Sequence, residues 1–135
     1  MAATPSLLLC ASLMILGLLG VCGAGKAESM EKPVVRLAEL EIDPNQIQVY
    51  RAALKEEIEA SIRIEPGVLT LYAVSIKEHP TQIRIFETYA SSAAYEAHLQ
   101  TAHFKKYKSE TRNMVRSLRL IETEPILLGS KADQH

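Results

Sequence analysis

The chain has 135 residues, a length that fits one domain. Its 15 Lys and Arg residues nearly balance its 16 Asp and Glu residues. This balance argues against a nucleic-acid-binding protein, because such proteins carry a clustered basic surface. A domain of this size buries only about two-thirds of its surface, so pairing with a second copy would help its core.

The first 27 residues are predicted to be an export signal. Residues 7–22 contain no charged side chain, and this run falls short of the ~20 apolar residues that span a bilayer comfortably. Small residues follow at once, so cleavage after Ala24 or Ala27 is expected, with release to the periplasm or the medium. Three alternatives stay open: lipid attachment at Cys22 in a partial lipobox, an uncleaved membrane anchor, and a true start at Met30.

Both cysteines, Cys10 and Cys22, lie inside this segment. The mature domain therefore contains no thiol, and it can form neither a disulfide nor a thiolate metal site. Residues 28–33 are expected to form a short polar linker, residues 34–128 the domain, and residues 129–135 a polar tail.

The domain begins with a predicted strand and a long predicted helix. The side chains of Val34–Ile42 alternate as in a strand with both faces partly covered. Asp43 is a suitable N-cap, and Gln46 completes a capping-box spacing. The helix is expected to end near Arg63, before the helix-breaking pair Pro66-Gly67. Its predicted apolar stripe consists of Ile47, Tyr50, Leu54, Ile58 and Ile62.

A hairpin follows the first helix. Val68–Ile76 and Gln82–Tyr89 are rich in β-branched and aromatic residues, which is typical of strands. Residues 77–81 between them are polar and are expected to form the turn. Ser91 and Ser92 then both offer a cap for the next helix.

The second helix is predicted in two pieces. The first piece ends near Leu99, and a new helical spacing begins after Thr101. The residues at this spacing are Phe104, Tyr107, Thr111, Val115 and Leu118. The last strand is expected over residues 118–128, interrupted by Pro125.

The predicted order is therefore β-α-β-β-α-β. This is the ferredoxin-like split βαβ order of an α+β domain, with an antiparallel sheet covered by helices on one face. The other face would carry Val68, Thr70, Tyr72 and Val74, which is too much apolar surface for a monomer to expose comfortably. Two such sheets facing each other would close a dimeric α+β barrel, so a homodimer is expected.

Three motifs then occur in order along the chain. Glu65–Leu69 is an acidic-x-Gly turn, and Ile85–Tyr89 is an apolar pair followed by Glu and, two residues later, an aromatic residue. Tyr95–Tyr107 contains the pattern A-H-x-x-T-x-H-F. On these motifs the chain resembles the antibiotic biosynthesis monooxygenase family. The resemblance implies a dimeric α+β barrel, and several members oxidise phenolic or quinol compounds with molecular oxygen, without flavin, haem or metal.

Other proteins of similar fold degrade haem, modify polyketides or isomerise a sugar signal. The haem-degrading members use an Asn, Trp and His set and the polyketide-modifying members also use a Trp, whereas this chain contains no Trp. The resemblance therefore implies a cofactor-independent monooxygenase that oxidises a small aromatic or quinol-type substrate. The alternatives are an isomerase of a small carbonyl signalling compound and a non-catalytic dimeric small-ligand-binding protein.

His98, His103 and Glu87 are the candidate catalytic residues. A neutral imidazole can take a proton from a phenol or quinol, although either histidine could instead cap a helix or bond a turn. A carboxylate in the apolar and aromatic strand around Glu87 is costly to bury unless it is paired. It can accept a proton or orient a histidine, with burial raising its pKa, or form an ion pair with Arg84 or Arg36.

Tyr72, Tyr89 and Tyr107 are the candidate substrate-binding residues. A tyrosine can hydrogen-bond a quinol oxygen and stack on its ring, but core packing is the plainer alternative. The three catalytic candidates also resemble a metal site of two histidines and one carboxylate. Their spacing matches no known metal motif, so neither a metal nor another cofactor is predicted.

Basic residues cluster late in the chain, where a second helix is expected. A solvated face is the simplest interpretation of this cluster. Weak attraction to membrane headgroups is the alternative, and it would suit an enzyme that acts on membrane-derived quinols. The residues are Lys105, Lys106, Lys108, Arg112, Arg116 and Arg119.

Overall fold

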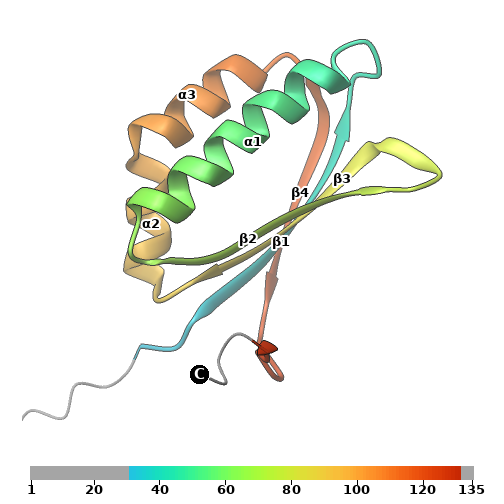
Figure 1. The fold of residues 1–135 in the computed structure, drawn as a ribbon. Coiled ribbons are helices and arrows are strands. Elements are labelled where there is room, and N and C mark those ends of the chain that lie inside the picture. Colours follow the sequence, from blue (N-terminus) through green and yellow to red (C-terminus); the bar gives the residue numbers. More distant parts are fainter. Residues whose placement is uncertain (1–30, 132–135) are drawn as a thin grey trace, which may run out of the picture.

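A computed structural model of the protein describes residues 31–131. This part forms a four-stranded antiparallel sheet with three helices on one face (Figure 1). The α+β, ferredoxin-like prediction is therefore confirmed. The predicted export signal lies outside the described residues, as do residues 28–30 of the predicted linker and the end of the predicted tail. None of the helices within residues 31–131 is long and apolar enough to cross a membrane.

The strands follow the order β2-β3-β1-β4 across the sheet, so β1 and β3 are central and β2 and β4 are edges. Each neighbouring pair is antiparallel. The helices pack over the sheet, with α1 beside α3 (Figure 1). The elements are β1 Val34–Ile42, α1 Ile47–Ile64, β2 Val68–Ile76, β3 His79–Tyr89, α2 Ser92–Gln100, α3 Ala102–Thr111 and β4 Val115–Thr123.

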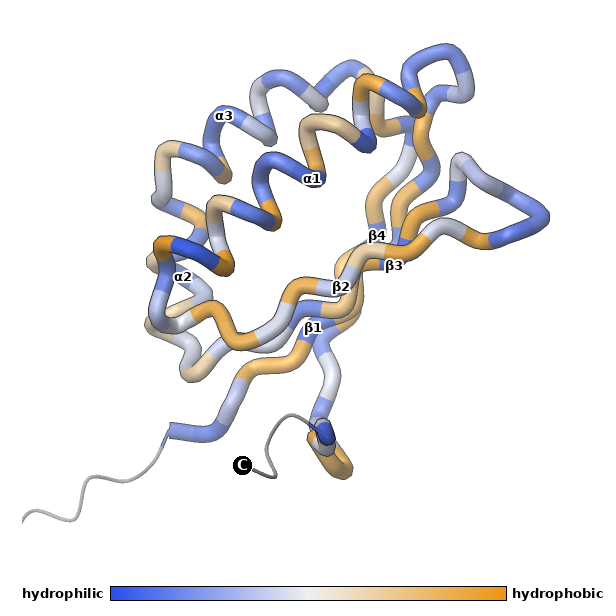
Figure 2. The backbone as a smooth tube through the Cα atoms, viewed as in Figure 1, coloured by the Kyte–Doolittle hydropathy of each residue, from blue (hydrophilic) through white to orange (hydrophobic). Residues whose placement is uncertain are grey.

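The core lies between the sheet and the helices. In the register of β1 and β3, Ala38 lies opposite Ile85 and Leu40 opposite Ile83, and all four are buried. Hydrophobic residues occur along all the strands, whereas the helices carry mixed residues (Figure 2). The buried members of the main core cluster are Ala38, Leu40, Ile42, Tyr50, Leu54, Ile83, Ile85 and Tyr107.

The predicted capping box at the start of α1 is wrong. The helix begins at Ile47 with Gln46 as N-cap, and no side chain caps it. Asp43 is used elsewhere: its Oδ1 accepts the Asn45 amide at 2.8 Å, and its Oδ2 lies 3.1 Å from the guanidinium of Arg116.

The apolar stripe of α1 also differs from the prediction at its end. Ile62 is 50% exposed, whereas Glu57 and Ser61 are buried. On the buried face of α1, Glu57 lies 3.7 Å from His98 of α2 and accepts a hydrogen bond from Ser61. A polar patch therefore replaces the expected apolar end of the stripe.

The hairpin turn is shorter than predicted. Ile76 already pairs with His79, so only Lys77 and Glu78 form the turn and β3 begins three residues earlier. Val68 is buried on the helix side, because the register shifts between Val68 and Thr70.

The predicted continuation of the second helix to Leu118 is also wrong. The α3 helix ends at Thr111, and β4 places Leu118 opposite Leu40 and Leu120 opposite Ala38. The spacing fits a helix as well as a strand, but the free edge of β1 offers a full ladder of backbone hydrogen bonds. The strand ends at Thr123 and not at residue 128, because Thr123 already pairs with Val35, close to the residue where β1 begins.

A row of apolar side chains, one from each strand, crosses the face of the sheet away from the helices. Tyr72 lies opposite Phe86, Phe86 opposite Leu37, and Leu37 opposite Ile121. We call these four residues the open-face row; Tyr72 is 67% exposed and Phe86 48%. This face matches the predicted bare face at Thr70, Tyr72 and Val74.

Candidate functional site

A cavity of about 550 Å³ lies between the helix side of the sheet and the α2–α3 pair. Its lining is mostly apolar and aromatic, and such cavities are the usual places for small ligands. Glu87 and His98 are the only acidic or histidine residues that line it, within residues 31–131. Exposed Lys108, Arg112 and Arg116 also border it. The apolar and aromatic lining residues are Ala38, Leu40, Ile85, Tyr89, Tyr95, Leu99, Phe104, Tyr107, Val115, Leu118 and Leu120.

The break between α2 and α3 positions the two histidines. Thr101 has an extended backbone, and its Oγ1 accepts the Phe104 amide at 3.3 Å, which caps α3. The same hydroxyl donates to the His98 carbonyl at 2.8 Å and so closes α2. His98 therefore lies in the last turn of α2 and His103 in the first turn of α3.

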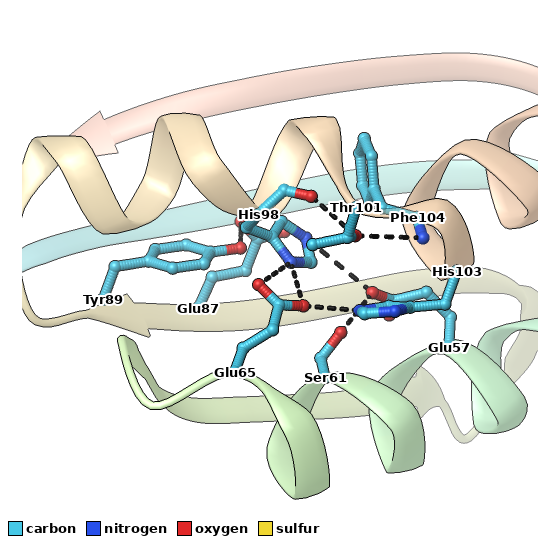
Figure 3. A network of polar contacts seen from close by, with 9 residues as sticks. All are labelled: Glu57, Ser61, Glu65, Glu87, Tyr89, His98, Thr101, His103 and Phe104. Atoms are coloured by element: carbon cyan, nitrogen blue, oxygen red, sulfur yellow. Dashed lines mark hydrogen bonds and ion pairs between the residues drawn. The ribbon is translucent and has the colours of Figure 1, made fainter.

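One carboxylate joins both histidines. Glu65 Oε1 lies 3.0 Å from Nδ1 of His98 and 2.5 Å from Nε2 of His103 (Figure 3). A second carboxylate, Glu57, accepts the Ser61 hydroxyl at 2.7 Å, and its Oε1 lies 3.7 Å from Nε2 of His98. We call Glu57, Glu65, His98 and His103 the histidine–carboxylate network.

The turn that follows α1 packs closely against α2, and this contact brings Glu65 to the network. Glu65 follows α1 directly, and a Cβ at Gly67 would lie 2.5 Å from Cβ of Ala94 in α2. Only glycine lets the turn after α1 pack this tightly against α2. The acidic-x-Gly motif thus has a physical reason: its glycine permits the contact, and its acidic residue reaches His98.

The pKa values of the two carboxylates of the network shift in opposite directions. Burial acts to raise the pKa of Glu65, but the hydrogen bonds to His103 and His98 outweigh it and hold that pKa below its usual value. Burial raises the pKa of Glu57, and the bond from Ser61 offsets this only in part. Glu65 is therefore the more strongly ionised partner of the histidines.

Glu87 lies apart from this network, on the wall of the cavity. Burial raises the pKa of its carboxyl, as expected from the sequence, although Tyr89 donates a hydrogen bond to its Oε2 at 3.1 Å. Arg84 pairs with Glu39 at 3.5 Å. Arg36 lies opposite Glu87 in the register but contacts Glu122 at 3.2 Å.

The three candidate tyrosines do not lie together. Tyr89 and Tyr107 line the cavity, and the Tyr107 hydroxyl lies 2.7 Å from that of Tyr50. Tyr72 belongs to the open-face row on the opposite side of the sheet, so it does not line this cavity. Tyr95, which the sequence did not single out, does line it.

Of the two candidate histidines, His98 lines the cavity. His98 is 3% exposed, and its ring centroid lies 5.3 Å from that of Tyr89 and 4.6 Å from that of Phe104. Both ring nitrogens contact carboxylates that do not line the cavity. His103 does not line the cavity either.

Three of the six residues of the basic cluster, Lys106, Arg116 and Arg119, are paired with acidic residues. Lys106 lies 2.6 Å from Glu56, and Arg119 lies 3.5 Å from Glu39. These pairs favour a solvated face, and contact with a membrane stays an untested prediction.

Comparison with known proteins gives one family. Residues 33–110 match the model of the family described as antibiotic biosynthesis monooxygenase. The structure is similar to that of a candidate antibiotic biosynthesis monooxygenase from Bacteroides thetaiotaomicron, with 52% identity, a TM-score of 0.72, and coverage of 74% of this chain and 95% of that chain. No curated protein matches the chain.

Two further structures are more distant. A candidate monooxygenase from Lactobacillus acidophilus has 30% identity and a TM-score of 0.66, over 67% of this chain and 43% of that chain. A candidate antibiotic biosynthesis monooxygenase from Nitrosomonas europaea has 19% identity and a TM-score of 0.66, over 70% of this chain and 90% of that chain, and supports the fold alone.

Proposed function

Because the chain belongs to the antibiotic biosynthesis monooxygenase family, we propose that it is a cofactor-independent monooxygenase of a small phenolic or quinol-type compound. The observation that carries the proposal is one carboxylate, Glu87, in the wall of a cavity that is otherwise mainly apolar and aromatic. The cavity, about 550 Å³, is large enough for a compound of one or two aromatic rings.

In this proposal Glu87 is the general base. A carboxylate whose pKa is raised by burial is a better proton acceptor than an ordinary glutamate. It takes one hydroxyl proton from the substrate, and the resulting anion is electron-rich enough to react with oxygen. Tyr89 holds the carboxylate in place through its hydrogen bond.

The overall reaction balances without an added reductant. A hydroquinone and O₂ give a hydroxyquinone and water: one oxygen atom enters the ring and the other leaves as water. All four electrons come from the substrate. The protein supplies proton transfer, orientation of the ring between Tyr89 and Tyr107, and a water-poor cavity.

The histidines are not the proton acceptors in this proposal, although the sequence made them candidates for that role. Because both nitrogens of His98 face the α1 side, we assign the ring of His98 to the cavity wall and the proton transfer to Glu87. His103 supports His98 through the carboxylate that they share.

Labelled oxygen tests the function. Purified protein, a simple hydroquinone and ¹⁸O₂ should give one labelled atom in the quinone product and one in water, at a rate above that of spontaneous oxidation. Turnover of a carbonyl compound without oxygen would instead support an isomerase. Binding of the hydroquinone without any turnover would support a ligand-binding protein, and either result would contradict the proposal.

A further inference from the structure

The histidine–carboxylate network contains a set of metal-binding groups that take no part in the proton transfer of the proposed function. Glu57, His98 and His103 each offer one ligand atom, and these atoms all lie within 4.8 Å of one another. They come from α1, α2 and α3. We propose that they form a binding site for a transition-metal dication such as Zn²⁺, at the junction of the three helices.

The carboxylate of this set is not the one expected from sequence. Glu87 was grouped with the two histidines, but it bonds Tyr89 on the cavity wall. Glu57 lies 3.7 Å from Nε2 of His98, and two ligands at this separation subtend about 120° at an ion bound ~2.1 Å from each. Two imidazoles and one carboxylate suit Zn²⁺ and similar ions better than Ca²⁺ or Mg²⁺, which prefer oxygen ligands.

Glu65 supplies the outer shell of this site. A histidine that binds a metal through one nitrogen usually bonds a carboxylate or carbonyl through the other, and this fixes its orientation. Glu65 Oε1 contacts Nδ1 of His98 and Nε2 of His103, which leaves the opposite nitrogen of each ring for the ion. One carboxylate thus orients both histidine ligands at once.

The balance of charge also favours a cation here. With neutral histidines the network carries the charge of two carboxylates, and both are largely buried, with side-chain exposures of 6% and 10%. No Lys or Arg within residues 31–131 forms an ion pair with Glu57 or Glu65. Buried charges normally need partners, and a dication would neutralise this pair.

Of the three proposed ligands, only His98 also lines the substrate cavity. Glu57 and His103 border a crevice of about 10 Å³ between α1 and α3, which has room for about one water molecule as a fourth ligand. Ligand atoms of a tetrahedral ion with bonds of ~2.1 Å lie about 3.4 Å apart, so a pair separated by as much as 4.8 Å must close on binding. The side chain of His103, at 18% exposure, has the most freedom to move.

Titration of the metal-free full-length protein with ZnCl₂, followed by calorimetry, tests the site. We expect one ion per chain and a higher melting temperature with zinc, because an ion that binds only the folded state stabilises it. Cobalt chloride is a second probe: Co²⁺ at this site should give the visible absorption of a four-coordinate ion with nitrogen and oxygen ligands, and Zn²⁺ should remove it.

Variants locate the bound ion. Glu57→Gln and His103→Ala should each weaken zinc binding by more than tenfold, and Glu65→Gln by ~10–100-fold as an outer-shell change. His79→Ala is the matched control, because His79 is an exposed histidine at the hairpin turn. It should bind zinc like the wild type.

Several results would overturn the proposal. The first is a wild-type chain that binds no zinc at micromolar concentration. The second is binding that the Glu57 and His103 variants leave unchanged. The third is a cobalt spectrum with thiolate charge transfer, which would place the ion at Cys10 or Cys22. If a variant does not fold, the cobalt spectrum of the wild type still decides between these ligand sets.

Discussion

The hydroxyls of Tyr50 and Tyr107 lie 2.7 Å apart in the core and join α1 to α3. Burial raises the pKa of Tyr50 to about 12 and also raises that of Tyr107. The folded protein therefore keeps protons that the unfolded chain loses above pH ~10. Burial of this pair is favourable while both hydroxyls remain protonated.

Stability should consequently fall at alkaline pH. The contribution of Tyr50 is complete below pH ~10 and decreases as the pH approaches 12, by about 1.4 kcal/mol per pH unit. Urea unfolding between pH 8 and 11.5 measures this loss. Tyr50→Phe should give a shallower decrease than the wild type. Equal slopes for the two proteins would contradict the pKa shift.

Replacement of Glu87 should separate activity from stability. Glu87→Gln removes the proposed base, and turnover should fall ~10²–10⁴-fold. Because burial raises the pKa of Glu87, ionising it costs folding free energy at neutral pH, so the variant should melt at the same temperature or higher. The difference should disappear below pH ~3.5, where the carboxyl of Glu87 is protonated in both the folded and the unfolded state.

The control for this prediction is Glu122→Gln, an exposed carboxylate on β4. It should keep full turnover. If Glu87→Gln retains wild-type turnover, the proposed base is wrong. If it unfolds the domain, the carboxylate is structural.

Two adjacent serines give a matched test of helix capping. Ser91 accepts the Ala94 amide at 3.1 Å, whereas Ser92 is exposed in the first turn of α2. Ser91→Ala should lower the free energy of unfolding by about 1 kcal/mol, and Ser92→Ala should have little effect. Denaturant unfolding of both variants checks this, and equal losses would mean that the cap contributes nothing.

The open-face row should form the interface of a homodimer. It crosses all four strands, and a neighbouring row of charged residues, Arg84–Glu39–Arg119, is already paired within the chain. Phe86→Glu places a charge in the middle of the row, and it should convert a dimer to a monomer in light scattering at micromolar concentration. Val49→Glu, an exposed apolar position on α1, should leave the mass unchanged. A monomeric wild type would contradict this interface.

The order of elements could be predicted from sequence because each strand and helix has its own period and its own breakers. Val115 and Leu118 were the exception, since their spacing also fits the preceding helix. These residues form a strand because they pair with the edge of β1, which is distant in the sequence. Local patterns do not contain such information.

The candidate site was predicted in part. The motif located His98, His103 and Glu87, but sequence alone did not indicate that Glu87 and the histidines have separate partners. Glu57 gave a signal that could have been used, because it is a charged residue on the buried stripe of α1, three residues after Leu54. Burial of such a residue requires a polar partner, and the histidines are that partner.

The double use of Thr101 has a consequence for how this fold can diverge. Its hydroxyl ends one helix and starts the next, so the junction has no spare residue. An insertion or deletion of one residue there would turn α3 by about 100° relative to α2. That turn would carry His103 away from Glu65. Related chains can therefore change residue types around this junction, but they must keep the four residues that separate His98 from His103.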